Sequence, residues 1–342
     1  MKIAVLTITK EAERLGKTLA KDLANAELIC CRGNTAKAIA LAWKDYDALI
    51  CIMATGIVVR TIVPLVEDKK TDPAVLVMDQ KGKYIIPILS GHLGGANGLA
   101  RKISAIMGAR PVVTTASDLM GNTALDIWIR DQGLRVANPE VLARLMGRLL
   151  DRGRLSIFSD SGLPPLPHDL LEVDSIYEAD MIVTPSSKAM GTGEQHMGQV
   201  NRGALILHPP VLVAGIGCNR GTAPEKIADA LNHTFISVGL SLDSLCRLAS
   251  IDIKKDEIGL VDFANKTGLD LFFYSAQELN SITDTGYSEA VFRATGARGV
   301  CEPAAVLASG QGELIVRKQR CKDVTIAVAK ATWPWWEQAP GQ

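Results

Sequence analysis

The sequence predicts an α/β protein with open, mainly parallel sheets, and three observations lead to this fold class. Apolar segments of strand length alternate with amphipathic segments of helical period along the first third of the chain. Several of the strands run into glycine-rich or Ser/Thr-rich turns that open helices. Hydrophobic residues make up 47% of the 342 positions, which suffices for sizeable cores. Such alternation places helices on both faces of a parallel sheet.

We expect residues 1–137 to form an N-terminal α/β domain with an open, mainly parallel sheet and flanking helices. Its first helix is expected to bury the stripe of Leu15, Leu19 and Leu23. The segment 74–89 reads as two strands around the turn Gln80–Gly82, a hairpin. Further strands are expected at 2–8, 46–54 and 109–118, and helices at 9–26, 55–68, within 90–108 and at 124–134.

The rest of the chain divides into a middle α/β segment, 138–208, a separate C-terminal α/β domain, 209–330, and a Trp-rich tail, 331–342. The middle segment reads as a helix at 139–153 followed by short strands. In the C-terminal domain the segment 211–232 is expected to form a strand, a glycine turn at 215–221 and a helix. Residues 241–268 are expected to form two helices with a break, and 313–330 a hairpin. Of two interpretations of the tail, a packed latch is favoured over a contact patch.

Composition excludes several classes of protein. Lys and Arg together number 37, as do Asp and Glu, so the net charge is zero, and aromatic residues are 5% of the chain. Nucleic-acid binders usually carry a basic surplus or stacking aromatics. No apolar run reaches the roughly 20 residues of a membrane-spanning helix. Seven Cys with no CxxC motif predict reduced thiols in a cytoplasmic protein.

Four polar turns follow strands and are the candidate ligand sites, because open α/β sheets bind ligands beyond the carboxyl ends of their strands. Glycines there allow close backbone approach, and amides at helix starts attract anions. Each turn is equally well explained as a tight connection. The turns are 53–56 with the nearby Arg60, 90–97, 114–118 and 215–221. Their candidate binding residues are Thr55, Gly56, Arg60, Ser90, Gly91, Gly94, Gly95, Asn97, Gly215, Gly217, Cys218, Arg220 and Gly221.

Few side chains in these turns suit acid–base chemistry. His92 lies within the second turn and could transfer protons near neutral pH, or could simply hydrogen-bond the turn. Glu302 precedes Pro303 and is a second candidate base, although capping the following helix is the favoured interpretation. The Cys218 thiol at a helix start could have a lowered pKa. The five His are scattered without metal-ligand spacing, so no metal site is predicted.

Five motifs together resemble the cobalt-precorrin-5A hydrolases, the CbiG-type proteins of anaerobic cobalamin biosynthesis. They are MATGIVVR (53–60), SGHLGGAN (90–97), TTASD (114–118), GIGCNRG (215–221) and GVCEPAAVLA (299–308). The resemblance implies a hydrolase of a carbon–carbon bond in vitamin B12 synthesis. Water opens the ring-A lactone of cobalt-precorrin-5A. The methylated meso carbon leaves as acetaldehyde, giving cobalt-precorrin-5B with a contracted ring. Cobalt belongs to the substrate, so no cofactor is expected.

The resemblance also suggests roles and partners. His92 is the first candidate base and Glu302 the second, while amides of Gly94–Gly95 or Gly217–Cys218 are candidate oxyanion donors. The expected partner is the anionic cobalt tetrapyrrole, bound by local donors such as Arg60 and Arg220. A homodimer and hand-over to other cobalamin-pathway enzymes are further hypotheses. A non-catalytic corrinoid carrier is the alternative function. A nucleotide-dependent enzyme ranks third, because GIGCNRG misses GxGxxG spacing by one residue.

Overall fold

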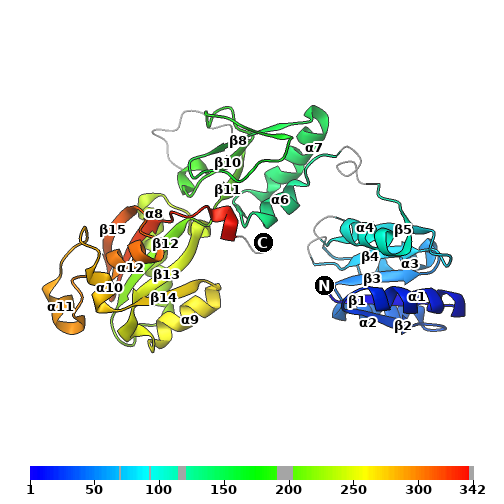
Figure 1. Cartoon of the computed structure of the whole chain (residues 1–342), viewed down its shortest axis with the longest axis horizontal. Helices are drawn as coiled ribbons and strands as arrows, with labels where there is room; N and C mark the ends of the chain where they lie inside the picture. The colour runs from blue at the N-terminus through cyan, green and yellow to red at the C-terminus, as the bar shows by residue number, and fades with distance from the viewer. Residues whose placement is uncertain (69–70, 92–93, 115–120, 191–202, 339–342) are drawn as a thin grey trace. The chain divides into compact units, whose positions relative to one another are not determined.

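A computed structural model describes residues 1–68, 71–91, 94–114, 121–190 and 203–338. The chain forms two compact units, Met1–Ile127 and Trp128–Gln342. Within the described ranges, no helix is both long and apolar enough to span a bilayer. The α/β class with parallel-rich sheets is confirmed: one sheet lies in the first unit and two lie in the second (Figure 1).

The first unit holds a six-stranded sheet in the order β2-β1-β3-β4-β5-β6. Strands β1 to β4 are parallel, β5 is antiparallel to β4, and β6 is parallel to β5. The strands are β1 (Ile3–Thr7), β2 (Ala26–Cys30), β3 (Ala48–Ile52), β4 (Ala74–Met78), β5 (Tyr84–Leu89) and β6 (Arg110–Pro111). The helices are α1 (Lys10–Asp22), α2 (Thr35–Asp45), α3 (Thr55–Ile62) and α4 (Ala96–Met107).

Both faces of this sheet are covered, because alternate residues of each buried strand point to opposite sides. In β1, Val5 packs with Leu19 of α1 and Leu99 of α4 on one face. The neighbouring Leu6 packs with residues of α2 and α3 on the other. Figure 1 shows the helix pairs on either side of the strands. This two-sided burial explains why β1, β3 and β4 are continuously apolar in sequence.

The hairpin predicted at 74–89 is confirmed, whereas residues 27–45 had no assignment from sequence. Strands β4 and β5 pair antiparallel, with Met78 opposite Ile85. The unassigned stretch holds most of β2 and all of α2. Strand β2 lies at the edge of the sheet and is only half-buried, so its pattern is not the continuous apolar run of a central strand.

The second unit begins with a middle sheet in the order β7-β11-β10-β8-β9, in which β7 alone is antiparallel to its neighbour. The strands are β7 (Arg135–Val136), β8 (Leu155–Ser159), β9 (Leu170–Glu172), β10 (Met181–Val183) and β11 (Leu205–His208). The helical segments are α6 (Leu125–Asp131), which contains the division between the units, η1 (Pro139–Val141), α7 (Leu142–Arg152) and η2 (Ser187–Met190).

The C-terminal sheet has the order β14-β13-β12-β16-β15, with β12, β13 and β14 parallel and β16 antiparallel to both of its neighbours. Its strands are β12 (Leu212–Cys218), β13 (Leu245–Ile251), β14 (Asp270–Tyr274), β15 (Leu314–Cys321) and β16 (Val324–Lys330). Its helical segments are α8 (Pro224–Val238), η3 (Leu242–Ser244), η4 (Asp252–Lys254), α9 (Ile258–Thr267), α10 (Ala276–Asn280), α11 (Glu289–Thr295), α12 (Cys301–Ala308) and η5 (Trp335–Gln338).

One C-terminal assignment from sequence is wrong. The first helix expected within 241–268 is a short η3 followed by strand β13, which pairs with β12 and β14. Its Leu, Cys and Ala residues fit either a buried helix or a buried strand, and local period does not separate the two in so short a run. Pairing on both sides decides for the strand.

The Trp-rich tail packs within the second unit, as the latch interpretation expects. Trp335 is 1% exposed, and its Nε1 donates to Ser161 O at 3.1 Å. Trp336 packs edge-on against it, and Trp333 lies 4.0 Å from the Arg247 guanidinium. The tail thereby joins the C-terminal sheet to the loop after β8 of the middle sheet.

Candidate functional site

Three of the four candidate turns follow strands of the N-terminal sheet, and they do not all leave it on the same side. The fourth, 215–221, belongs to the C-terminal sheet. The turn at Thr55 and Gly56 follows β3 and so lies at the carboxyl edge of β1–β3. Both residues are exposed, and Ala54 at the start of α3 offers no side-chain cap. The Arg60 guanidinium donates to Gly56 O of its own helix at 3.3 Å. These amides and this cation therefore face solvent at the carboxyl edge of β1–β3.

The segment that begins at Ser90 leaves the sheet on the opposite side, because β5 runs antiparallel to β4, and β6 runs in the same direction as β5. Ser90 marks this position: its Oγ donates at 3.0 Å to the carbonyl of Asp72, just before β4 begins. A five-residue strand is about 16 Å long. The structure thus places Ser90 and the carboxyl end of β6 on one side of the sheet and Thr55 and Arg60 on the other. His92 and residues 115–120 lie outside the described residues.

The glycines around His92 serve a tightly wound loop. A Cβ on Gly94 would lie 2.4 Å from Ser90 Cβ, and Gly95 starts α4 at φ 81°. A Cβ on Gly91 would lie 3.0 Å from the side chain of the buried Asn97. The Ala96 and Asn97 amides donate back to the carbonyls of Ser90 and Gly91. Contacts of the described residues therefore fix both ends of this segment, and Ser90 leaves no room for a Cβ at Gly94.

The first two glycines of GIGCNRG allow close packing within the C-terminal fold, against helix α12 at Gly215 and against strand β16 at Gly217. Gly215 lies inside β12, where an added Cβ would lie 1.8 Å from Cys301 O of α12. At Gly217 an added Cβ would lie 2.6 Å from Thr325 Oγ1 on the paired strand β16. These contacts correct the expectation that both glycines sit in an open turn.

The remaining GIGCNRG residues make internal contacts at the carboxyl edge of β12 and β13. Arg220 pairs with Asp256 at 2.6 Å and donates to Ile253 O at 2.9 Å. The Gly221 amide donates to Glu257 Oε1 at 2.8 Å. Burial raises the pKa of the half-buried Cys218 thiol, opposite to the lowering expected from sequence. Burial therefore disfavours the thiolate form of Cys218.

A buried ion pair at this edge was missed from sequence. The Lys254 ammonium lies 3.2 Å from Glu257 Oε2, and the two residues are 9% and 3% exposed. The pair joins the turn after β13 to the loop after β12 through the Gly221 amide. The signal in the sequence is the charged run at 252–257, which follows 245–251 directly. With 245–251 interpreted as a helix, that run was not expected at the end of a strand.

Glu302 has a structural role in the C-terminal part of the fold. It is 6% exposed in the first turn of α12. Its Oε2 accepts the Gly286 amide at 2.6 Å, and its Oε1 accepts the Lys318 amide at 2.9 Å. With both oxygens engaged by backbone donors, the carboxylate ties the 281–288 loop to β15. It does not cap α12, whose N-cap is Val300 with no side-chain hydrogen bond, so the expected capping role is wrong, and this cross-link is favoured over the general base.

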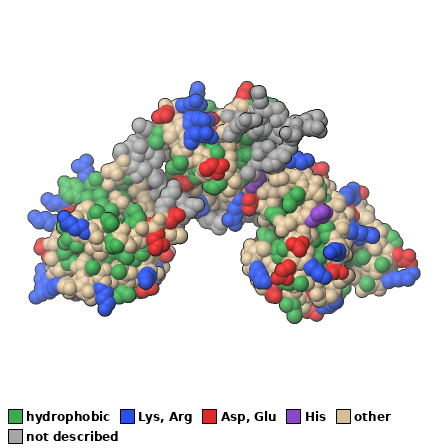
Figure 2. Space-filling view, turned by 180° about the vertical axis from the view of Figure 1, so that it is seen from behind, with side chains coloured by type: hydrophobic (Ala, Val, Ile, Leu, Met, Phe, Trp, Pro, Cys, Tyr) green, Lys and Arg blue, Asp and Glu red, His purple; other side chains and the backbone are tan. Residues whose placement is uncertain are grey.

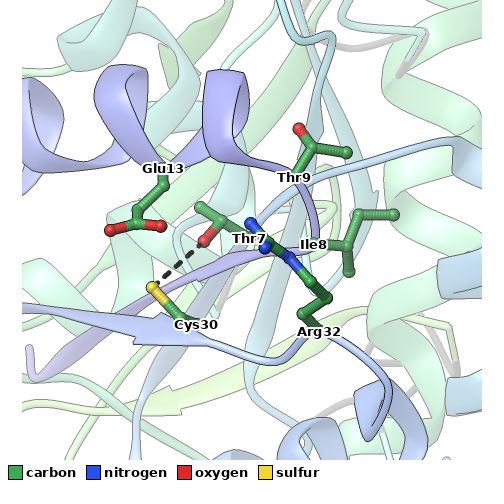
Figure 3. Close-up of a pocket in the computed structure, with 6 residues that line it drawn as sticks. All are labelled: Thr7, Ile8, Thr9, Glu13, Cys30 and Arg32. Carbon is green, nitrogen blue, oxygen red and sulfur yellow. Dashed lines mark hydrogen bonds between the residues drawn. The ribbon is translucent and has the colours of Figure 1, made fainter.

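A cavity of about 260 Å³ lies at the carboxyl edge of β1 and β2. None of its residues was a candidate from sequence, although a Thr-Ile-Thr run ending the first predicted strand was a usable signal. In Figure 3 the Arg32 side chain extends toward Thr7 and Thr9, with the Glu13 carboxylate and the Cys30 thiol beyond Thr7. The lining residues are Thr7, Ile8, Thr9, Glu13, Cys30 and Arg32.

Metal and charge distributions add two observations. Among the described residues, no group of three or more His, Cys, Asp or Glu side chains could hold a metal ion. Basic and acidic side chains are interspersed over the face shown in Figure 2, with no single basic field. Recognition of an anionic ligand would therefore depend on a few placed groups.

Comparison with known proteins identifies relatives over most of the chain. Family models described as "Cobalamin synthesis G N-terminal" and "Cobalamin synthesis G C-terminus" match residues 37–118 and 212–329. A cobalt-precorrin-5A hydrolase from Priestia megaterium is 37% identical, with 84% of this chain and 79% of that protein covered. A protein of the same name from Salmonella typhimurium is 32% identical, with 87% and 86% covered. The crystal structure of CobE, from the cobalamin biosynthetic pathway, is 34% identical over 35% of this chain and 89% of that chain, with a TM-score of 0.34.

Proposed function

The chain belongs to the cobalt-precorrin-5A hydrolase family, and we propose that it opens the ring-A lactone of cobalt-precorrin-5A and releases acetaldehyde, giving cobalt-precorrin-5B. One observation carries the proposal: a relative of that name is 37% identical across 84% of this chain. The likeness therefore includes both units rather than one shared module. Cobalt enters and leaves with the substrate in this proposal.

The proposed reaction has two steps with different demands. Water adds to the lactone carbonyl, the ring C–O bond breaks, and the ring-A acetate and a hydroxyl are formed. Removal of the hydroxyl proton then drives cleavage of the carbon–carbon bond, with the conjugated macrocycle accepting the electron pair and acetaldehyde leaving. A base is needed in both steps, and donors are needed for the oxyanion of the first.

We assign the base role to His92. An imidazole accepts protons near neutral pH without a large pKa shift. The strands before its loop and before the 114–118 segment, β5 and β6, are parallel neighbours and end on the same side of the sheet, which supports this choice. Gly94 and Gly95 are the proposed oxyanion donors, and Ser90, Gly91 and Asn97 hold the loop. Thr55, Gly56 and Arg60 lie at the other edge and belong to a different contact surface.

The test is acetaldehyde release by the purified full chain from cobalt-precorrin-5A. Acetaldehyde is measured by its reduction with alcohol dehydrogenase and NADH, and the macrocycle by mass spectrometry. The proposal expects one acetaldehyde for each cobalt-precorrin-5B formed, at a rate proportional to the amount of protein. Binding of the substrate with no acetaldehyde above a heat-inactivated control would instead establish a carrier.

A further inference from the structure

The cavity at the carboxyl edge of β1 and β2 has no role in the reaction proposed above, yet it lies where this fold binds ligands. In an open α/β sheet, ligands bind beyond the carboxyl ends of the strands, and β1 and β2 both end at this side of the sheet. Thr7 and Thr9 at the end of β1 and Arg32 just after β2 line the cavity at this position.

Positive charge in the cavity comes from Arg32. The guanidinium is exposed, and it makes no hydrogen bond or ion pair with the described residues. The acid in the cavity, Glu13, pairs with Lys17 at 2.9 Å. That hydrogen bond lowers the pKa of Glu13, with smaller contributions from Cys30 and Arg32. The local balance of Arg32, Lys17 and Glu13 is therefore one net positive charge.

Hydrogen-bond donors surround the same space. Thr9 Oγ1 accepts the Ala12 amide at 3.1 Å, and its own proton can be donated to a ligand. Helix α1 starts at Lys10, directly after the lining residue Thr9. Thr7 adds a hydroxyl whose contact with Cys30 Sγ is a weak one at 3.8 Å.

The size of the cavity limits its occupant. A volume of about 260 Å³ lies below the range of roughly 300–1,000 Å³ usual for whole small-molecule ligands. A macrocycle does not enter this space, but a single carboxylate or phosphate group does. We propose that the cavity lined by Arg32, Thr7 and Thr9 is an oxyanion site that takes one carboxylate or phosphate group of a ligand, at the edge opposite the His92 loop.

Cys30 provides a direct probe, because its exposed thiol lines the cavity. Iodoacetate and iodoacetamide alkylate a thiolate by the same displacement of iodide, and only iodoacetate carries a carboxylate. Both alkylation rates at a given thiol are proportional to its ionised fraction. Their ratio, iodoacetate over iodoacetamide, is therefore independent of that fraction. Rates are measured on the intact chain by peptide mass spectrometry, with the half-buried Cys321 as the reference thiol.

The oxyanion site predicts a rate ratio, iodoacetate over iodoacetamide, about three- to tenfold higher at Cys30 than at Cys321, as one placed guanidinium contributes. Arg32→Gln should remove the excess. Arg14→Gln, which removes an exposed charge of α1 outside the cavity, should keep it. Equal ratios at the two thiols, or an excess that survives Arg32→Gln, would overturn the proposal.

Competition identifies the source of the anion. Inorganic phosphate and cobyrinic acid, a corrinoid with free carboxylates, are added separately, and cobinamide with amidated arms is the neutral control. Selective slowing of Cys30 alkylation by cobyrinic acid assigns the site to a macrocycle side arm, and slowing by phosphate assigns it to a phosphate-bearing ligand. Slowing by neither, or by cobinamide equally, contradicts an oxyanion site. The assay is independent of acetaldehyde release, so either proposal can fail alone.

Discussion

Some of the candidate site residues make hydrogen bonds and ion pairs that stabilise the fold, and these are poor candidates for catalysis or substrate binding. Glu302 and Arg220 looked like catalytic and binding groups in sequence, but backbone amides, a carbonyl and Asp256 engage them. Sequence shows residue type, whereas the partners come from segments far apart in the chain, such as 286 and 318 around position 302. The assignment of roles at this scale therefore needed the structure.

His92 carries the clearest catalytic prediction. His92→Ala should lower kcat for acetaldehyde release by about 10²- to 10⁴-fold with little change in KM, since general-base catalysis contributes in that range. His233→Ala, at an exposed position of α8, is the matched control and should be unaffected. A His92→Ala enzyme that keeps its kcat within a few-fold would place the base elsewhere.

Gly215 should tolerate no side chain. Gly215→Ala places a Cβ 1.8 Å from Cys301 O, and separating α12 from β12 to relieve this contact should cost about 3 kcal/mol or more. Gly147→Ala, inside α7 with nothing within 4 Å of the new Cβ, should be neutral or stabilising by up to about 1 kcal/mol. Denaturant unfolding measures both. Equal stability of the two variants would contradict the packing role of Gly215.

Whole elements were predictable from sequence where burial is uniform and were missed where it is not. The apolar runs at 48–52 and 74–78 identified central strands, and the turn at Gln80–Gly82 identified the hairpin. Edge strand β2 was missed, and β13 was interpreted as a helix. The consequence of this hairpin was the costliest gap: because β5 runs antiparallel to β4, the loop at Ser90 leaves the sheet on the side opposite to the turn at Thr55, although all four turns had been treated as one kind of site.

Strand β13 also predicts a pH dependence of stability through Cys246. Burial raises the pKa of this thiol from its ordinary 9.0 to about 11. Between these values the unfolded chain loses the proton and the folded chain keeps it, so stability is complete below pH 9 and falls as the pH rises toward 11.

At pH 10 the loss from this one group should be about 1 kcal/mol. Cys246→Ala should show a shallower decline in unfolding free energy between pH 8 and about 10 than the unmodified chain. Identical pH slopes for the two proteins would mean that the thiol titrates alike in the folded and unfolded states.

At the scale of the molecule, the tail links two sheets of the second unit. Trp335 is buried and donates to Ser161, and Lys330 Nζ donates to Asp160 O at 3.0 Å. Trp335→Ala should cost about 3–5 kcal/mol, as for other large aromatic truncations. Calorimetry of Trp335→Ala should also show two transitions, with the middle sheet unfolding at a lower temperature than the C-terminal sheet.

Glu337→Ala, an exposed change in the same tail segment, should leave the calorimetric profile unaltered. A Trp335→Ala protein with the stability of the unmodified chain would show that the latch contacts contribute little to holding the two sheets together.

The balanced charge, 37 basic against 37 acidic residues, sets how an anionic macrocycle is recognised. With no surplus of basic residues, we expect association to depend on placed groups such as loop amides and single arginines. A carrier could bind the macrocycle through the same groups. Catalysis, measured as acetaldehyde release, is therefore the property that distinguishes the proposed hydrolase from a carrier.

The central claim is therefore tested most directly by a single turnover of cobalt-precorrin-5A in water enriched in oxygen-18. Attack of water on the lactone carbonyl predicts acetaldehyde release and one heavy oxygen in the ring-A acetate of cobalt-precorrin-5B. Release of acetaldehyde with no label in that carboxylate would contradict acyl attack. Substrate bound without acetaldehyde release would contradict the hydrolase itself.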